Sequence, residues 1–216
     1  MAETQPIRLV IFDFDGTLSD SGDWFLSVVD HLSERFKFRS VQPDEVEMLR
    51  HKSSREVIEH LRIPKWKLPR IARYVRKLVN EHVMQFELFP GTPDLLQQLS
   101  DTGVRIALVT SNAKNNAKII LGPENAARID LFVCGSSLFG KAAKFRRVLK
   151  KMKMSPGEAL AIGDETRDVD SAREVGMRCG SVLWGYAGET LLVEMKPDAL
   201  FRTPQDIVDY VAAHRG

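Results

Sequence analysis

Five short runs of apolar residues punctuate the chain, and most of them stop abruptly at a glycine, an aspartate or a small polar residue. The runs cover residues 7–12, 104–109, 131–134, 159–162 and 179–184. Nearly continuous hydrophobic strands of this length are typical of a parallel sheet that is buried on both faces. Amphipathic stretches at 92–101 and 142–152 predict helices between the strands. Repeated strand–helix–strand units predict an α/β, Rossmann-like core of three layers.

One region breaks this alternation. Between about residues 18 and 88 no convincing strand pattern occurs, and helical spacing appears instead at 24–36, 43–50, 54–61 and 68–86. We therefore predict an all-helical cap domain at 18–87, inserted after the first strand. The core domain would then consist of residues 1–17 and 88–216.

Charge and cysteine content narrow the class of protein. The chain has 31 Lys and Arg against 29 Asp and Glu, a net charge of +2, which argues against a dedicated nucleic-acid binder. The two cysteines, Cys134 and Cys179, lack C-x-x-C spacing and favour a reducing compartment. No apolar stretch approaches the roughly 18 residues that span a membrane, and no signal-peptide pattern occurs. We expect a cytoplasmic protein without a nucleic-acid or membrane partner.

Polar groups suited to catalysis follow four of the five runs. They are Asp13 and Asp15 after the first run, Ser111 and Asn112 after the second, Lys141 beyond the third, and Asp164 and Asp168 after the fourth. In an open parallel sheet, ligands bind outside the carboxyl ends of the strands. Groups far apart in the sequence are therefore expected to meet at one edge of the sheet.

Three carboxylates in one small site repel each other unless a cation balances them. Magnesium (Mg2+) prefers oxygen ligands and would let a phosphate dianion approach. A carboxylate can then attack phosphorus and form an aspartyl-phosphate. Asp15 lies on the same side of an extended chain as Asp13 and can exchange protons with the leaving oxygen and with water. Lys141 and Ser111 can hold the phosphoryl oxygens.

These motifs resemble those of the haloacid dehalogenase (HAD) superfamily. The segment 13–18, DFDGTL, looks like its first motif, 110–112 its second, Lys141 its third and 163–168, GDETRD, its fourth. The order matches, and the resemblance covers nearly the whole chain, including the helical cap. The segment 89–91 looks like the family's return from cap to core, and 184–186 resembles phosphoglycolate phosphatase-like members.

The resemblance implies roles for individual residues. Asp13 would be the nucleophile and Asp15 the acid/base, and Asp13, the Asp15 backbone carbonyl and Asp164 would hold magnesium. Asp168 would complete the metal site or pair with Lys141. Arg55, between two cap helices, is either a contact to the far end of the substrate or an exposed helix-start residue. Asn112 either touches the substrate or supports its loop.

The sequence thus predicts a magnesium-dependent phosphatase for a small phosphorylated metabolite, acting as a monomer or homodimer. A haloacid dehalogenase would not need Asp15, because no leaving oxygen has to be protonated. A sugar-phosphate mutase of the β-phosphoglucomutase type would carry a histidine where this chain has Phe25. A non-catalytic phosphate-binding regulatory protein is a further alternative. Glu165 replaces the small residue often found in the fourth motif, and its effect stays open.

Overall fold

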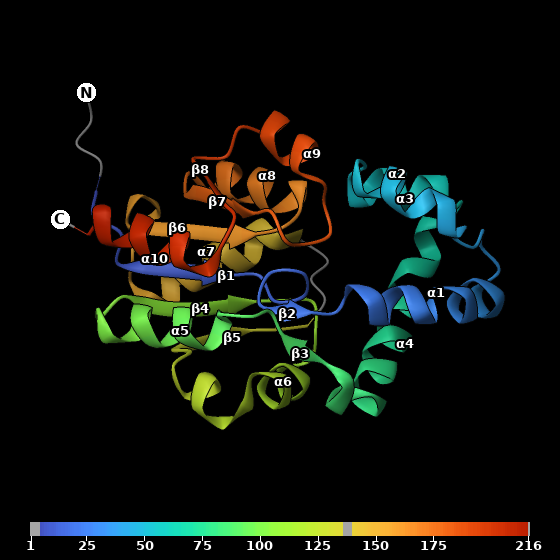
Figure 1. Cartoon of the computed structure of the whole chain (residues 1–216), viewed down its shortest axis with the longest axis horizontal. Helices are drawn as coiled ribbons and strands as arrows, with labels where there is room; N and C mark the ends of the chain where they lie inside the picture. The colour runs from blue at the N-terminus through green and yellow to red at the C-terminus, as the bar shows by residue number, and fades with distance from the viewer. Residues whose placement is uncertain (1–4, 136–139, 216) are drawn as a thin grey trace.

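The computed structural model describes residues 5–135 and 140–215, and a six-stranded sheet lies at its centre (Figure 1). The strand order is β5-β4-β1-β6-β7-β8, and every neighbouring pair is parallel. The strands are β1 (Leu9–Phe12), β4 (Arg105–Val109), β5 (Leu131–Val133), β6 (Ala159–Gly163), β7 (Arg178–Val182) and β8 (Ala199–Phe201). The predicted fold class is confirmed, and each of the five predicted runs overlaps a strand.

Helices cover both faces of this sheet. On one face lie α5 (Thr92–Asp101), α6 (Lys114–Ala127) and α10 (Pro204–Ala213), and on the other α7 (Gly140–Met152) and α8 (Thr166–Val175). The short helix α9 (Glu189–Glu194) buries Leu192. Side chains of β1 point alternately to the two faces. Val10 and Phe12 belong to the apolar cluster with α5, α6 and α10, whereas Leu9 and Ile11 belong to the cluster with α7 and α8. All four are buried, so β1 sits between β4 and β6 in the middle of the sheet.

Between β1 and β4 the chain forms a helical cap, seen on the right of Figure 1. Its helices are α1 (Gly22–Phe36), α2 (Val46–Arg50), α3 (Ser54–His60) and α4 (Leu68–Glu81), with short 3₁₀ turns η1 (Pro43–Glu45), η2 (Lys65–Lys67) and η3 (Val83–Gln85). Leu32 and Phe36 of α1 pack against Ile71 and Leu78 of α4 in a small apolar cluster of their own. The cap therefore has its own hydrophobic contacts.

The last predicted cap helix is shorter than expected. It ends at Glu81 rather than at residue 86, and η3 then leads into Phe86 in an extended conformation. Phe86 is buried in the apolar cluster that includes α5, α6 and α10, and the centroid of its ring lies 4.7 Å from that of Trp24. A continuous helix would carry Phe86 along the axis of α4, so the break lets this ring pack between cap and core.

The two connections between cap and core run side by side. The strands β2 (Ser19–Asp20) and β3 (Glu87–Leu88) pair antiparallel as a two-stranded sheet. The expectation of no strand between residues 18 and 88 was wrong here, because strands of two residues are too short to show an alternating pattern. The pair lies at both ends of the predicted cap, whose bounds at 18 and 87 stay a prediction.

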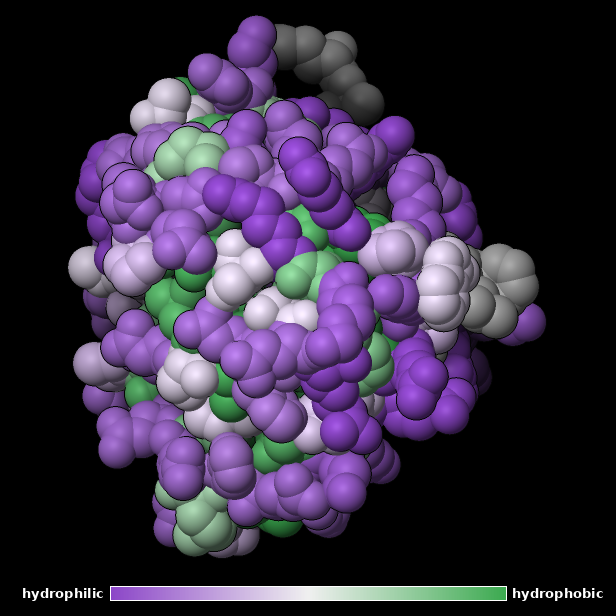
Figure 2. Space-filling view, turned by 90° about the vertical axis from the view of Figure 1, so that its right-hand side faces the viewer, coloured by the Kyte–Doolittle hydropathy of each residue, from purple (hydrophilic) through white to green (hydrophobic). Residues whose placement is uncertain are grey.

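The surface on the cap side is mostly hydrophilic, with hydrophobic residues visible in small patches (Figure 2). In the described part of the chain no helix is both long and apolar enough to cross a membrane.

Candidate active site

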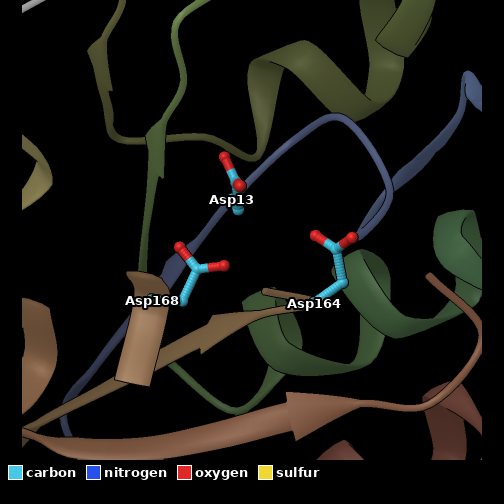
Figure 3. Close-up of side chains that lie close together, drawn as sticks. All are labelled: Asp13, Asp164 and Asp168. Atoms are coloured by element: carbon cyan, nitrogen blue, oxygen red, sulfur yellow. The ribbon is translucent and has the colours of Figure 1, made fainter. Parts of the chain in front are cut away.

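Three aspartates meet at the carboxyl edge of the sheet. Asp13 follows β1, Asp164 follows β6, and Asp168 lies in the first turn of α8. One carboxylate oxygen from each lies within 4.8 Å of the others, and all three residues are buried. Figure 3 shows the three carboxylates pointing toward a common space. The predicted convergence of Asp13, Asp164 and Asp168 is thus what the structure shows.

The backbone around Asp164 explains how these groups come so close. The Thr17 hydroxyl donates to Asp164 Oδ1 and the Tyr186 backbone N–H donates to Oδ2, both at 2.9 Å. A Cβ atom at residue 185 would lie 2.2 Å from Asp164 Cβ and 2.5 Å from the backbone oxygen of Gly16. Only glycine at position 185 allows this approach, and the loop fixes the Asp164 side chain as a result.

A substitution at this glycine tests how tightly the loop is packed. We expect Gly185→Ala to lower the free energy of unfolding by at least about 1 kcal/mol, because the new methyl group meets backbone as well as the Asp164 side chain. Chemical denaturation would measure the loss. The matched control is Gly22→Ala, because a Cβ atom at residue 22 would meet the Tyr186 ring no closer than 3.4 Å, an ordinary van der Waals contact. An unchanged stability would contradict the packing argument.

Lys141, near the start of α7, is the counterion of the cluster. Its Nζ lies 2.7 Å from Asp13 Oδ2 and also pairs with Asp168 Oδ1. Burial by itself would lower the pKa of Lys141, but the negative charges of Asp13 and Asp168 raise it above its usual value. Lys141 therefore stays charged and links the nucleophile candidate to Asp168.

Lys144, one helical turn later, has a different environment. Its Nζ donates to the backbone oxygens of Thr110 at 2.6 Å and Gly135 at 2.5 Å. Burial and the charge of Lys141 lower the pKa of Lys144 to about 8. This lysine holds the ends of β4 and β5 together, and Lys141 is the one that reaches the carboxylates.

The Asp15 carboxyl group lies apart from the three clustered carboxylates. It accepts weak hydrogen bonds from Thr110 Oγ1 at 3.3 Å and Asn112 Nδ2 at 3.4 Å. Burial and the charge of Asp13 raise the pKa of Asp15 to about 6. A carboxyl group with such a pKa can both give and take a proton near neutral pH, which suits general acid/base chemistry.

The two candidates after β4 differ in exposure. Asn112 is buried and, besides its bond to Asp15, accepts the Ala113 backbone N–H at 2.8 Å, so it supports the loop. Ser111 is exposed at the same edge, just before α6. The Ser111 hydroxyl is therefore accessible to a ligand that reaches the carboxyl edge.

The donor set fits a hard divalent cation. Lys141 pairs with Asp13 and Asp168, so one lysine stands against three buried carboxylates in the described part of the cluster, which leaves net negative charge in a low-dielectric site. Oxygen-only ligands at this spacing suit magnesium, which is bound through a few carboxylates and keeps several waters. The residues present thus fit the ion that the motifs predict.

Arg55 does not join this cluster. About 80% of its side chain is exposed, and its Nε lies 3.2 Å from Glu59 Oε1 on the next turn of α3. The residue beside it, Ser54, reaches the core instead, where its hydroxyl donates to Glu165 Oε2. Contact between Arg55 and a substrate therefore stays a prediction.

Glu165 and Arg167 are two residues that the sequence patterns did not single out as part of the site. Arg167 Nη2 lies 2.5 Å from Glu165 Oε1, and both residues stand between Asp164 and Asp168 in the sequence. Glu165 precedes α8 as its N-cap, and its backbone N–H donates to Asp168 Oδ2 at 3.1 Å. A capping pattern with spacing i, i+3 was the available signal, and it links Glu165 to Asp168.

Comparisons with known proteins agree with this geometry. The sequence profile of the haloacid dehalogenase-like hydrolases matches residues 10–182. A phosphoglycolate phosphatase of Synechococcus elongatus is 29% identical over 206 residues, covering 95% of this chain and 97% of the relative. A phosphoglycolate phosphatase of Aquifex aeolicus is 25% identical and covers 96% of this chain and 98% of its own.

The fold has solved counterparts as well. A haloacid dehalogenase-like hydrolase from Streptococcus pneumoniae superposes with a TM-score of 0.78 at 22% identity, covering 94% of this chain and 98% of the other. The predicted enzyme class, phosphoric monoester hydrolase, is confirmed by the family match and the two curated relatives. With the four motifs meeting at one sheet edge and the profile matching most of its length, the chain belongs to the haloacid dehalogenase-like hydrolases.

Proposed function

We propose that this protein is a magnesium-dependent phosphatase that hydrolyses a small, phosphoglycolate-like phosphate monoester through an aspartyl-phosphate on Asp13. The observation that carries the proposal is the Asp13 carboxylate, which lies 2.7 Å from Lys141 Nζ and within 4.8 Å of Asp164 and Asp168. The substrate class is supported by the curated relatives that bear the name phosphoglycolate phosphatase.

Two proton-coupled steps follow from this arrangement. The Asp13 carboxylate attacks phosphorus, and the bond between phosphorus and the ester oxygen breaks. Asp15, with its pKa near 6, gives its proton to the departing oxygen. Asp15 then takes a proton from the water that attacks the aspartyl-phosphate, which restores both carboxyl groups and releases phosphate.

The remaining residues bind and position. Lys141 and the exposed Ser111 hydroxyl would contact the phosphoryl oxygens, where negative charge is carried in the transition state. Asp13, Asp164 and the backbone carbonyl of Asp15 would hold magnesium, and Asp168 fixes Lys141. When bound, the ion supplies the positive charge that lets a phosphate dianion approach a carboxylate.

Position 25 argues against the mutase alternative. A mutase needs a further acid/base group for the second sugar hydroxyl, and Phe25 of α1 carries none. Phe25 is partly exposed, at 44%, so its place is accessible but apolar. An assay of phosphate release distinguishes the proposed phosphatase from a dehalogenase and from a non-catalytic phosphate-binding protein.

The direct test is a screen of the purified protein against a library of metabolite phosphates, with p-nitrophenyl phosphate included. We expect phosphate release from 2-phosphoglycolate and related small monoesters in the presence of magnesium. Release from no compound of the library, with folded protein, would favour the non-catalytic alternative. Isomerised sugar phosphates without release of phosphate would favour the mutase.

Removal of the metal provides a further prediction. We expect EDTA to abolish phosphate release, added magnesium to restore it, and calcium to inhibit, because calcium prefers more ligands and looser geometry. Magnesium should also raise the melting temperature of the wild type, and by less in Asp164→Asn, which loses a charged ligand. Full activity in excess EDTA would contradict the proposal.

A further inference from the structure

Arg167 is a cation beside the site that the proposed mechanism leaves unused. It is the second residue of α8, between Asp164 and Asp168 in the sequence. Its side chain is 52% exposed. Among the described residues its guanidinium has one hydrogen-bond partner, Glu165 Oε1, which is bonded by Nη2. A planar guanidinium with further N–H groups available is suited to bind a carboxylate through two parallel hydrogen bonds.

The charge of Arg167 acts on the catalytic candidates. Burial and Asp13 raise the pKa of Asp15, and the charge of Arg167 opposes this rise, as it opposes the rise in the pKa of Lys141. In turn, Glu165 and Asp13 raise the pKa of Arg167 far above its usual value. The geometry agrees, because Arg167 directly precedes Asp168 in the first turn of α8, and a carboxylate oxygen of Asp168 lies within 4.8 Å of Asp13 and Asp164.

Glu165 connects this arginine to the cap. One carboxylate oxygen binds Arg167, and the other accepts the hydroxyl of Ser54 at the start of α3. The Gly188 N–H also donates to the Arg50 backbone oxygen at 2.7 Å, so the end of α2 meets the core as well. Arg167 therefore lies where cap and core come together next to the site.

The charges of the site show which group is free to recognise an anion. Lys141 is already shared between Asp13 and Asp168, and Lys144 donates to backbone oxygens. A substrate whose phosphoryl group faces Asp13 extends away from the sheet, toward the cap. An anionic group at that end would meet the half-exposed guanidinium of Arg167.

Resting on the proposed phosphatase function, we propose that Arg167 binds the non-reacting carboxylate of a phosphorylated hydroxy acid. Glu165 is the positioning residue, which orients the guanidinium and ties it to Ser54 of the cap. A residue of the core domain, within the fourth motif, would then distinguish monoesters that carry a carboxylate from those that do not. The contact between Glu165 and Ser54 would couple this recognition to the position of the cap.

The test uses a matched pair of ligands, 2-phosphoglycolate and ethyl phosphate, which differ chiefly in the carboxylate. Binding is measured by calorimetry with magnesium in Asp13→Asn and in the double variant Asp13→Asn/Arg167→Ala. We expect 2-phosphoglycolate to bind about 30-fold more weakly in the double variant, as for loss of a charge-assisted bidentate pair, and ethyl phosphate less than about threefold. Equal weakening of both ligands, or of neither, would overturn the proposal.

The matched control is Arg146→Ala in the same background. Arg146 is an exposed arginine whose ion pair with Glu174, at 2.8 Å, lies on the surface between α7 and α8. We expect this variant to bind both ligands like its parent. Because the Asp13→Asn background does not turn over, the binding difference is read independently of catalysis. A wild type that hydrolyses neither these two compounds nor any other in the library would refute the phosphatase function, while the binding comparison still decides on Arg167.

The positioning role of Glu165 needs a different readout. In the active enzyme, Glu165→Ala is expected to raise KM for 2-phosphoglycolate about tenfold with a smaller change in kcat, because an unanchored guanidinium loses side-chain entropy on binding. Glu165→Gln, which keeps a hydrogen-bond acceptor for Arg167, should recover part of the loss. If Glu165→Ala raises KM for p-nitrophenyl phosphate by the same factor, Glu165 supports the fold and does not position Arg167.

Discussion

Asp13→Asn is expected to reduce phosphate release by about 10³-fold or more, because the amide is a poor nucleophile and the reaction has no other attacking group at this position. The amide keeps the shape of the side chain, and its oxygen can still accept a hydrogen bond from Lys141, now 2.7 Å from Asp13 Oδ2. Initial rates with 2-phosphoglycolate and p-nitrophenyl phosphate would measure the effect. Residual activity above a few per cent of wild type would refute the assignment of Asp13.

The same variant should remain folded. Burial is the main cause that raises the pKa of both Asp15 and Asp164, and the negative charge of Asp13 adds to both shifts. The carboxylates of the cluster therefore repel one another. Removing one of the three clustered charges relieves this repulsion, and the melting temperature in EDTA is expected to equal or exceed that of wild type. Asp170→Asn, an exposed substitution on α8, is the matched control for both measurements. A loss of activity that accompanies unfolding would not support a catalytic role.

The core could be predicted because its strands are buried on both faces. Each buried strand leaves a dense apolar run, as β1 does with four buried residues in succession. The strand β8 was not predicted, since it has three residues, of which Leu200 is exposed, and it lies at the sheet edge. The paired strands β2 and β3 left no signal for the same reason of length.

In the site, too, some residues could be predicted from the sequence and others could not. Residues directly after strands were predictable, because the ends of parallel strands fix where Asp13 and Asp164 lie. Contacts between cap and core were not, since they depend on how two separately packed units meet. For Arg55 the sequence left two possibilities open, a substrate contact or an exposed helix-start residue; it is exposed and pairs with Glu59, while its neighbour Ser54 contacts Glu165. On a helix, adjacent residues point about 100° apart, and the sequence does not say which of them faces the core.

Lys141→Met is expected to lower kcat/KM by about 10²- to 10³-fold, the usual effect of removing one group that stabilises charge in the transition state. It should also destabilise the metal-free protein. The Lys141 side chain is 13% exposed, and its partners Asp13 and Asp168 are 6% and 1% exposed, so methionine leaves two buried carboxylates without their cation. Loss of one partner of a buried ion pair costs about 3 kcal/mol.

The dependence of that loss on magnesium separates electrostatics from packing. A bound divalent ion compensates part of the negative charge that Lys141 leaves behind, so the difference in unfolding free energy between Lys141→Met and wild type should be smaller in magnesium than in EDTA. Urea denaturation under both conditions would measure it. Lys150→Met, an exposed position on the same helix, controls for the change of side chain. An equal loss with and without magnesium would mean that Lys141 contributes chiefly through packing, and no loss in EDTA would mean that its ion pairs do not stabilise the fold.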